Sequence, residues 1–170
     1  MDILNWRQKD TWGREISLSA AGLPAGELTF QGWSSHDAVY TSGAATTQFK
    51  KCGWFEQEVE ILQQGERVGV ATSSLLGKTQ VSFTNGETYS LTSEYFSNNR
   101  SVQDQAGNRV IDFKQGAFNF SKGEIMVADS LPEQLKDVLV VTSLYLKLVT
   151  DSSIALIVIM FLFFYVVNLN

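Results

Sequence analysis

Two apolar segments follow each other near the C-terminal end of the chain, and they constrain its fold more than any other feature. The first covers residues 138–149 (VLVVTSLYLKLV) and the second covers residues 154–167 (IALIVIMFLFFYVV). As helices, both would be apolar on almost every side, and a helix of this kind must be enclosed by protein or by lipid. The sequence therefore predicts two hydrophobic helices that each need apolar surroundings.

The limits of these helices follow from the polar residues beside them. Pro132 suits the first turn of a helix, and Glu133 near that end interacts favourably with the helix dipole. The polar stretch at residues 150–153 (TDSS) interrupts the apolar sequence and supplies side chains that cap a new helix. We expect a β body over residues 1–130, one hydrophobic helix over 131–150 and a second apolar helix over 151–170.

The body has the pattern of an antiparallel β protein. Val59 and Ile61 alternate with Glu58 and Glu60, which is typical of a half-buried strand, and Asn85-Gly86 is a strong hairpin signal. About ten short strands at regular spacing favour a barrel or a sandwich. The expected strands cover residues 15–19, 27–30, 37–41, 56–62, 68–72, 79–83, 88–92, 101–103, 109–113, 117–120 and 124–127.

Composition argues against several functions. The 18 acidic residues outnumber the 13 basic ones, which does not suit a nucleic-acid-binding surface. One cysteine, Cys52, and one histidine, His36, cannot fill a typical zinc site. No catalytic motif and no glycine-rich phosphate loop is evident. We therefore expect no enzyme activity, catalytic residue, cofactor, metal or nucleic-acid partner. The tryptophans Trp6, Trp12, Trp33 and Trp54 could line a ligand groove, but core packing is the expected role.

The order of turns and strands resembles a known family. Gly53-Trp54-Phe55 is followed by residues 64–69 (QGERVG), 85–89 (NGETY) and 104–110 (DQAGNRV), and then by an apolar helix. This order is similar to the tubby-like superfamily, which includes the phospholipid scramblases and the LURP-one-related proteins. The resemblance implies a β-barrel closed around one hydrophobic C-terminal helix. The basic cluster through which tubby proteins bind phosphoinositides has no counterpart here, so no lipid-binding residue is transferred, and residues 104–108 lack the ligand spacing of a calcium loop.

The resemblance implies that the first helix fills the barrel. Its barrel-filling residues would be Val138, Leu139, Val141, Leu144, Tyr145 and Leu148. The alternative places residues 154–167 inside the barrel, and the first helix then needs a second apolar cover. The overall expectation is a mainly β fold: an antiparallel barrel with a hydrophobic helix in or against it, plus a second apolar helix.

The second helix is expected to contact a membrane or a partner. The contact residues would be Ile154, Leu156, Ile157, Ile159, Phe161, Phe163, Phe164 and Tyr165. Fourteen residues of helix span about 21 Å, less than the roughly 30 Å of a bilayer core, so this helix could instead be buried. Lys147 precedes it and no basic residue follows, which favours a β body on the cytoplasmic side.

Two functions remain open at this stage. The first is a non-enzymatic, membrane-associated β-barrel module of tubby or scramblase type, with a lipid-related or scaffolding role and a C-terminal anchor. The alternative is a soluble binding protein that holds a hydrophobic ligand or partner in or beside the barrel. A homo-oligomer or a protein partner that associates through the last helix is a further alternative to lipid.

Overall fold

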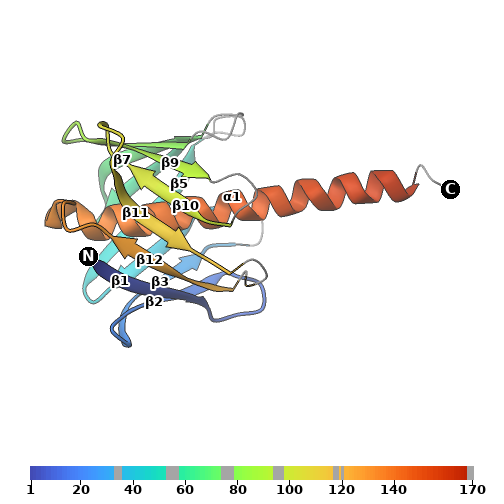
Figure 1. Ribbon diagram of the computed structural model, residues 1–170, viewed down its shortest axis with the longest axis horizontal. Helices are drawn as coiled ribbons and strands as arrows, with labels where there is room; N and C mark the ends of the chain where they lie inside the picture. The colour runs from blue at the N-terminus through green and yellow to red at the C-terminus, as the bar shows by residue number, and fades with distance from the viewer. Residues whose placement is uncertain are drawn as a thin grey trace.

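The chain forms a closed barrel around a helix (Figure 1). In the computed structural model the backbone is described for residues 1–32, 36–52, 58–73, 79–93, 98–116, 119 and 121–167, and within these residues twelve antiparallel strands surround a single helix. The side chains of Ser93 and of residues 153–167 are not described. The strands are β1 (Asp2–Gln8), β2 (Glu15–Ala20), β3 (Leu23–Phe30), β4 (Ala38–Ser42), β5 (Ala45–Cys52), β6 (Glu58–Gln63), β7 (Glu66–Ser73), β8 (Thr79–Phe83), β9 (Thr88–Ser93), β10 (Arg100–Gln103), β11 (Arg109–Lys114) and β12 (Lys122–Val127), and the helix is α1 (Glu133–Val167).

The barrel is closed by the first and last strands. Each strand pairs with its neighbours in the sequence, and β1 also pairs with β12 in the register Asp2↔Val127 to Arg7↔Lys122. Closure removes the free sheet edges that would otherwise template pairing with other chains. The chain enters the lumen through residues 128–132, and α1 leaves at the opposite side (Figure 1). We call these the entry end and the exit end.

The turns at the entry end are short and depend on glycine. Two connections have two residues each, and both residues have positive φ. The angles are 50° for Ala21 and 80° for Gly22 in the first, and 50° for Gln64 and 87° for Gly65 in the second. This is the backbone of the type I′ hairpin, which matches the twist of the flanking strands. The predicted hairpin at Asn85-Gly86 is confirmed by the pairing of β8 with β9. Its geometry differs, because Gly86 has a positive φ (91°) while the Asn85 side chain accepts a hydrogen bond from the backbone N–H of Glu87.

The prediction of about ten strands was too low. The strands β1 and β5 were not predicted, because each buries only one large apolar side chain: Trp6 in β1 and Phe49 in β5. Residue 119 is described and lies outside any strand, whereas the rest of the predicted strand at 117–120 falls outside the described residues. Residues 53–57, which carry part of the family resemblance and part of the predicted strand at 56–62, are also outside them.

The first half of α1 fills the lumen. Every residue from Val138 to Leu148 is buried, on all sides of the helix. The hydroxyl of Tyr145 donates a hydrogen bond of 2.7 Å to the carbonyl oxygen of His36, and its ring stacks on that of Phe49 at 4.4 Å. A closed sheet surrounds the helix completely, which explains why this segment is mostly apolar on every side.

The prediction of two helices was wrong. A single helix runs without interruption from Glu133 to Val167. The polar residues that suggested a break are accommodated within it: the Ser152 hydroxyl donates to the carbonyl of Leu148 at 2.8 Å, and Asp151 pairs with Lys147 one turn earlier. Serine can bond the preceding turn of its own helix, so polar residues alone do not end a helix.

We predict that Leu144→Ala lowers the free energy of unfolding by about 2–5 kcal/mol, because Leu144 has no exposed surface in the lumen and the truncation leaves a cavity. Leu23→Ala is the matched control, since this leucine is 72% exposed and its truncation should change stability by less than about 0.5 kcal/mol. Urea unfolding followed by tryptophan fluorescence measures both. Equal losses would contradict a lumen packed around the helix.

Candidate functional site

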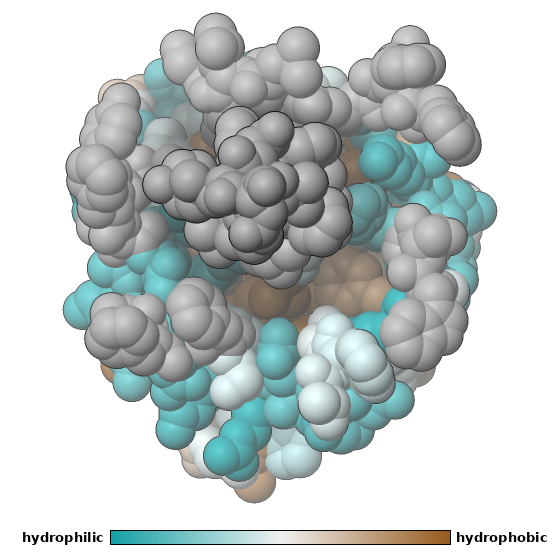
Figure 2. All heavy atoms as spheres, turned by 90° about the vertical axis from the view of Figure 1, so that its right-hand side faces the viewer, coloured by the Kyte–Doolittle hydropathy of each residue, from teal (hydrophilic) through white to brown (hydrophobic). Residues whose placement is uncertain are grey.

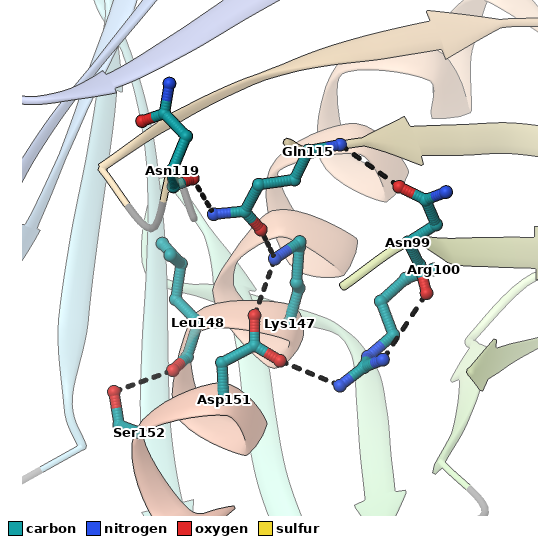
Figure 3. A network of polar contacts seen from close by, with 8 residues as sticks. All are labelled: Asn99, Arg100, Gln115, Asn119, Lys147, Leu148, Asp151 and Ser152. Carbon is teal, nitrogen blue, oxygen red and sulfur yellow. Dashed lines mark hydrogen bonds and ion pairs between the residues drawn. The ribbon is translucent and has the colours of Figure 1, made fainter. Parts of the chain in front are cut away.

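A buried lysine is the most unusual group in the lumen. The side chain of Lys147 has no exposed surface, although it lies in the middle of an apolar helix. Its ammonium donates to Asp151 Oδ2 at 2.5 Å and to Gln115 Oε1 at 2.6 Å (Figure 3). The nitrogen also lies 5.5 Å from the centre of the Trp6 ring, within the range of a cation–π contact. Burial of the charge is therefore compensated by several partners.

Asp151 connects this lysine to the barrel wall. Its other carboxylate oxygen accepts a hydrogen bond of 2.8 Å from the guanidinium of Arg100, which is 8% exposed at the start of β10. Gln115 in turn donates from its side chain to the carbonyl of Asn119 at 2.7 Å, and its backbone N–H donates to the Asn99 side chain at 3.1 Å. The polar network of Figure 3 thus joins α1 to two connections at the exit end.

Burial and the neighbouring carboxylate have opposite effects on the charge of Lys147. Burial lowers the pKa of Lys147, and the nearby Asp151 carboxylate opposes this effect by stabilising the charged amine. An amine that acts as a nucleophile must reach a substrate. Lys147 is enclosed and held by two oxygen acceptors, so its geometry suits the positioning of α1 along the barrel axis.

A groove crosses the outer wall at the exit end. It has a volume of about 860 Å³ and runs over the strands β2, β1, β12 and β11. Three basic residues line it, namely Arg7, Lys114 and Lys122, together with the carboxylate of Glu124 and several polar side chains. A second groove of about 780 Å³ lies at the entry end, where its charged lining residues are Glu87 and Asp104. The two grooves therefore differ in charge.

The predicted barrel-filling residues come together in the lumen. Val138, Leu139, Val141, Leu144, Tyr145 and Leu148 are all buried in the core that the strands form around α1. The predicted contact residues between Ile154 and Tyr165 lie in the part of α1 whose backbone continues past the barrel (Figure 1), and their side chains are outside the description. Within the residues described in full, no helix is long and apolar enough to cross a membrane.

The other candidate residues are dispersed. Trp6 is buried and Trp12 is exposed, while Trp33 and Trp54 lie outside the described residues. The described part of the chain contains no group of histidine, cysteine and carboxylate side chains that could hold a metal ion.

Sequence reasoning missed the network of Lys147, Asp151 and Arg100. The four-residue spacing of Lys147 and Asp151 on one helix was the available signal, since such pairs face each other. The partner Arg100 is 51 residues distant from Asp151, and nothing in the sequence connects the two.

We predict that Asp151→Asn lowers the free energy of unfolding by about 3 kcal/mol, because Lys147 then keeps a buried charge without its anionic partner. Adding Lys147→Met to this variant should recover at least half of the loss, since an apolar side chain suits the lumen. Glu133→Gln, which removes an exposed ion pair with Lys136 and a favourable charge at the start of the helix, is the control and should cost less than about 1 kcal/mol. Denaturant unfolding measures all three, and a double variant no more stable than Asp151→Asn would contradict the assignment.

The lowered pKa of Lys147 also predicts a pH dependence. In the unfolded chain the amine keeps its proton up to a pKa near 10.5, whereas the folded protein releases it at a lower pH. Between the two values the unfolded state binds more protons, so the free energy of unfolding rises with pH, and this stability is lost as the pH falls through the lowered pKa. Lys147→Met lacks this contribution. As the pH is raised to about 10.5, the free energy of unfolding of the wild type should therefore increase relative to that of Lys147→Met. A difference that stays constant with pH would contradict the prediction.

Comparisons with known proteins identify no relative of this chain. No protein-family model matches the chain, and neither does any curated protein or solved structure. The arguments about function that follow therefore rest on the residues and the geometry of this chain.

Proposed function

We propose that this protein is a non-enzymatic, membrane-associated β-barrel module of tubby or scramblase type, with a lipid-related or scaffolding role. The carrying observation is that α1 continues as a helix beyond the barrel, while residues 154–167 contain no charged side chain and no strong hydrogen-bonding group except the hydroxyl of Tyr165. The apolar part of this helix that leaves the barrel is inserted into a lipid bilayer.

The lumen is already occupied, which supports a location outside the barrel for the apolar extension. Residues 138–148 take up the interior, and their side chains are buried against the strands. Each large aliphatic or aromatic side chain gains about 1.5–3 kcal/mol when it leaves water. An extension with this composition is therefore strongly driven towards an apolar phase, and at about 1.5 Å per residue it can reach roughly 21 Å into lipid.

The family resemblance agrees with this proposal at the level of architecture. A β-barrel closed around a hydrophobic C-terminal helix is the arrangement that the resemblance to tubby-like and scramblase proteins implies, and the barrel around α1 supports it. Membership of the superfamily is part of the proposal. No phosphoinositide-binding residue and no calcium-dependent activity is transferred with it.

The charge near the extension supports a barrel on the cytoplasmic side. Lys147 is the last basic residue before the apolar extension, and Lys50, Lys51, Lys114 and Lys122 lie at the exit end of the barrel. Basic residues next to a membrane-inserted helix are enriched on the cytoplasmic side. The proposed orientation therefore places the barrel in the cytoplasm with its exit end towards the bilayer.

We predict that the full-length chain floats with phosphatidylcholine vesicles in a density gradient and that Ile157→Asp combined with Phe161→Asp abolishes flotation. Each aspartate costs about 3 kcal/mol at the centre of an inserted helix. Leu23→Asp makes the same kind of change at a site that is 72% exposed on the barrel and should float like the wild type.

Two results would contradict membrane insertion. A wild-type chain that remains monomeric in the aqueous fraction without detergent favours a soluble binding protein with a buried extension. A wild-type chain that forms a defined oligomer without lipid, and loses it in the double aspartate variant, favours association through the extension.

A further inference from the structure

We infer that α1 is a rigid stem, with no hinge between the barrel and the bilayer, and that it holds the barrel upright at one height above the lipid. This inference rests on the proposed function and adds to it the position and the orientation of the barrel. It is a mechanical property of the fold and requires no affinity of the barrel for a lipid head group.

The helix crosses the exit end without a break. Residues 133–170 contain no glycine and no proline, and α1 is continuous from Glu133 to Val167. Sharp kinks in helices arise mainly at proline, at pairs of glycine or serine, or at local bulges. The candidate outside the lumen is Ser152-Ser153. The helix runs straight through this pair (Figure 1), where the Ser152 hydroxyl donates to the carbonyl of Leu148 at 2.8 Å.

The wall holds α1 from nearly opposite sides at the exit end. On one side, the hydroxyl of Tyr145 donates to the carbonyl of His36, between β3 and β4, at 2.7 Å. On the other side, Arg100 at the start of β10 binds Asp151 at 2.8 Å. The order of strands in the closed sheet places β3 and β4 across the barrel from β10. A helix held from both sides cannot pivot about a single contact.

A contact at the entry end supports the same helix. The ammonium of Lys136 lies 2.9 Å from the carboxylate of Asp2 on β1. Between Lys136 and Asp151 the helix rises by about 22 Å, and every residue from Val138 to Leu148 is buried in the lumen. A helix enclosed over this length takes its direction from the barrel, so the apolar extension continues along the barrel axis.

No linker separates the barrel from the apolar extension. Asp151 is bonded to the wall, Ser152 is the first exposed residue of α1 after the lumen, and Ile154 begins the apolar residues. Asp151 and Ile154 are separated by about 4.5 Å of helix rise. The head-group layer on each side of a bilayer is roughly 5–7 Å thick. The exit end therefore reaches the head groups whenever Ile154 enters the hydrocarbon.

The exit face limits how deeply the protein can sink. Viewed from this side, the described surface around the helix is largely hydrophilic (Figure 2). Charges of both signs meet on it: Lys9 pairs with Glu27 at 2.9 Å, and Lys50 lies opposite Glu60 in the pairing of β5 with β6. Charged groups resist entry into hydrocarbon. The stem and this face together set the height, independently of the charge of the lipid.

The length of the extension favours an upright barrel. A helix longer than the hydrocarbon core tilts to fit, whereas a shorter one thins the bilayer locally. The extension covers about 21 Å of a core of roughly 30 Å, so it gains nothing by tilting. The entry end, with the groove that Glu87 and Asp104 line, then faces the solution roughly 20 Å further from the lipid than the exit end.

The test measures the height of two equally exposed positions above phosphatidylcholine vesicles. The full-length chain carries Cys52→Ser and a single donor fluorophore, either at Trp12→Cys (71% exposed, exit end) or at Leu23→Cys (72% exposed, entry end). Time-resolved energy transfer to acceptor-labelled head groups gives the distance and its spread. We expect the label at position 12 near the head groups and the label at position 23 roughly 20 Å further away, both with narrow distributions.

Two insertions of equal length after Ser152 distinguish a rigid stem from a flexible tether. The helical sequence Glu-Ala-Ala-Lys adds about 6 Å of helix. It should move both labels away from the lipid by that amount and keep the difference between them. The flexible sequence Gly-Ser-Gly-Ser should broaden both distributions and reduce the difference.

The outcomes separate the stem from the anchor. Broad distributions in the wild-type chain, like those of the flexible insertion, overturn the rigid stem and leave the anchor intact. Equal distances for the two labels show a barrel lying on its side and also overturn the stem, as does a helical insertion that leaves both distances unchanged. A wild-type chain that does not bind the vesicles overturns the proposed function and the stem with it.

Discussion

The enclosure of α1 by the closed sheet is the constraint on which the rest of the structure depends. A barrel of this size without a helix would contain a large empty lumen, and a helix with the composition of residues 138–148 would not be stable in water. The pairing of β1 with β12 completes the wall around this filler. Sheet and helix therefore each supply the apolar surroundings that the other needs.

The polar network at the exit end determines how far the helix passes through the barrel. Apolar packing alone would tolerate a helix displaced along the axis, because neighbouring turns carry similar side chains. Lys147 and Asp151 remove this freedom, since a shift by one turn would separate their charges from Gln115 and Arg100 in a buried setting. The network also marks the boundary between the part of α1 that protein surrounds and the apolar part that we assign to lipid.

Much of the architecture could be predicted from local patterns. The alternation around Val59 and Ile61 and the hairpin at residues 85–86 identified a body of antiparallel strands, and the closed barrel was among the expected folds. The strands β1 and β5 escaped prediction because their burial depends on neighbours that are distant in sequence, such as Gly123 opposite Trp6. The single continuous helix was not predicted because residues 150–153 resemble a helix cap, and their polar groups find partners only in the folded barrel.

The sequence by itself determined that two successive apolar segments must be enclosed by protein or lipid. It also determined that the preceding residues could form a body of short β-strands. Hydrophobic periodicity is a local property, and the chain displays it without reference to the fold. Only the tertiary structure decided that the two segments are one helix, that the first lies in the lumen and that Arg100 meets Asp151. These outcomes depend on strand direction and closure, which bring together residues that no local pattern relates.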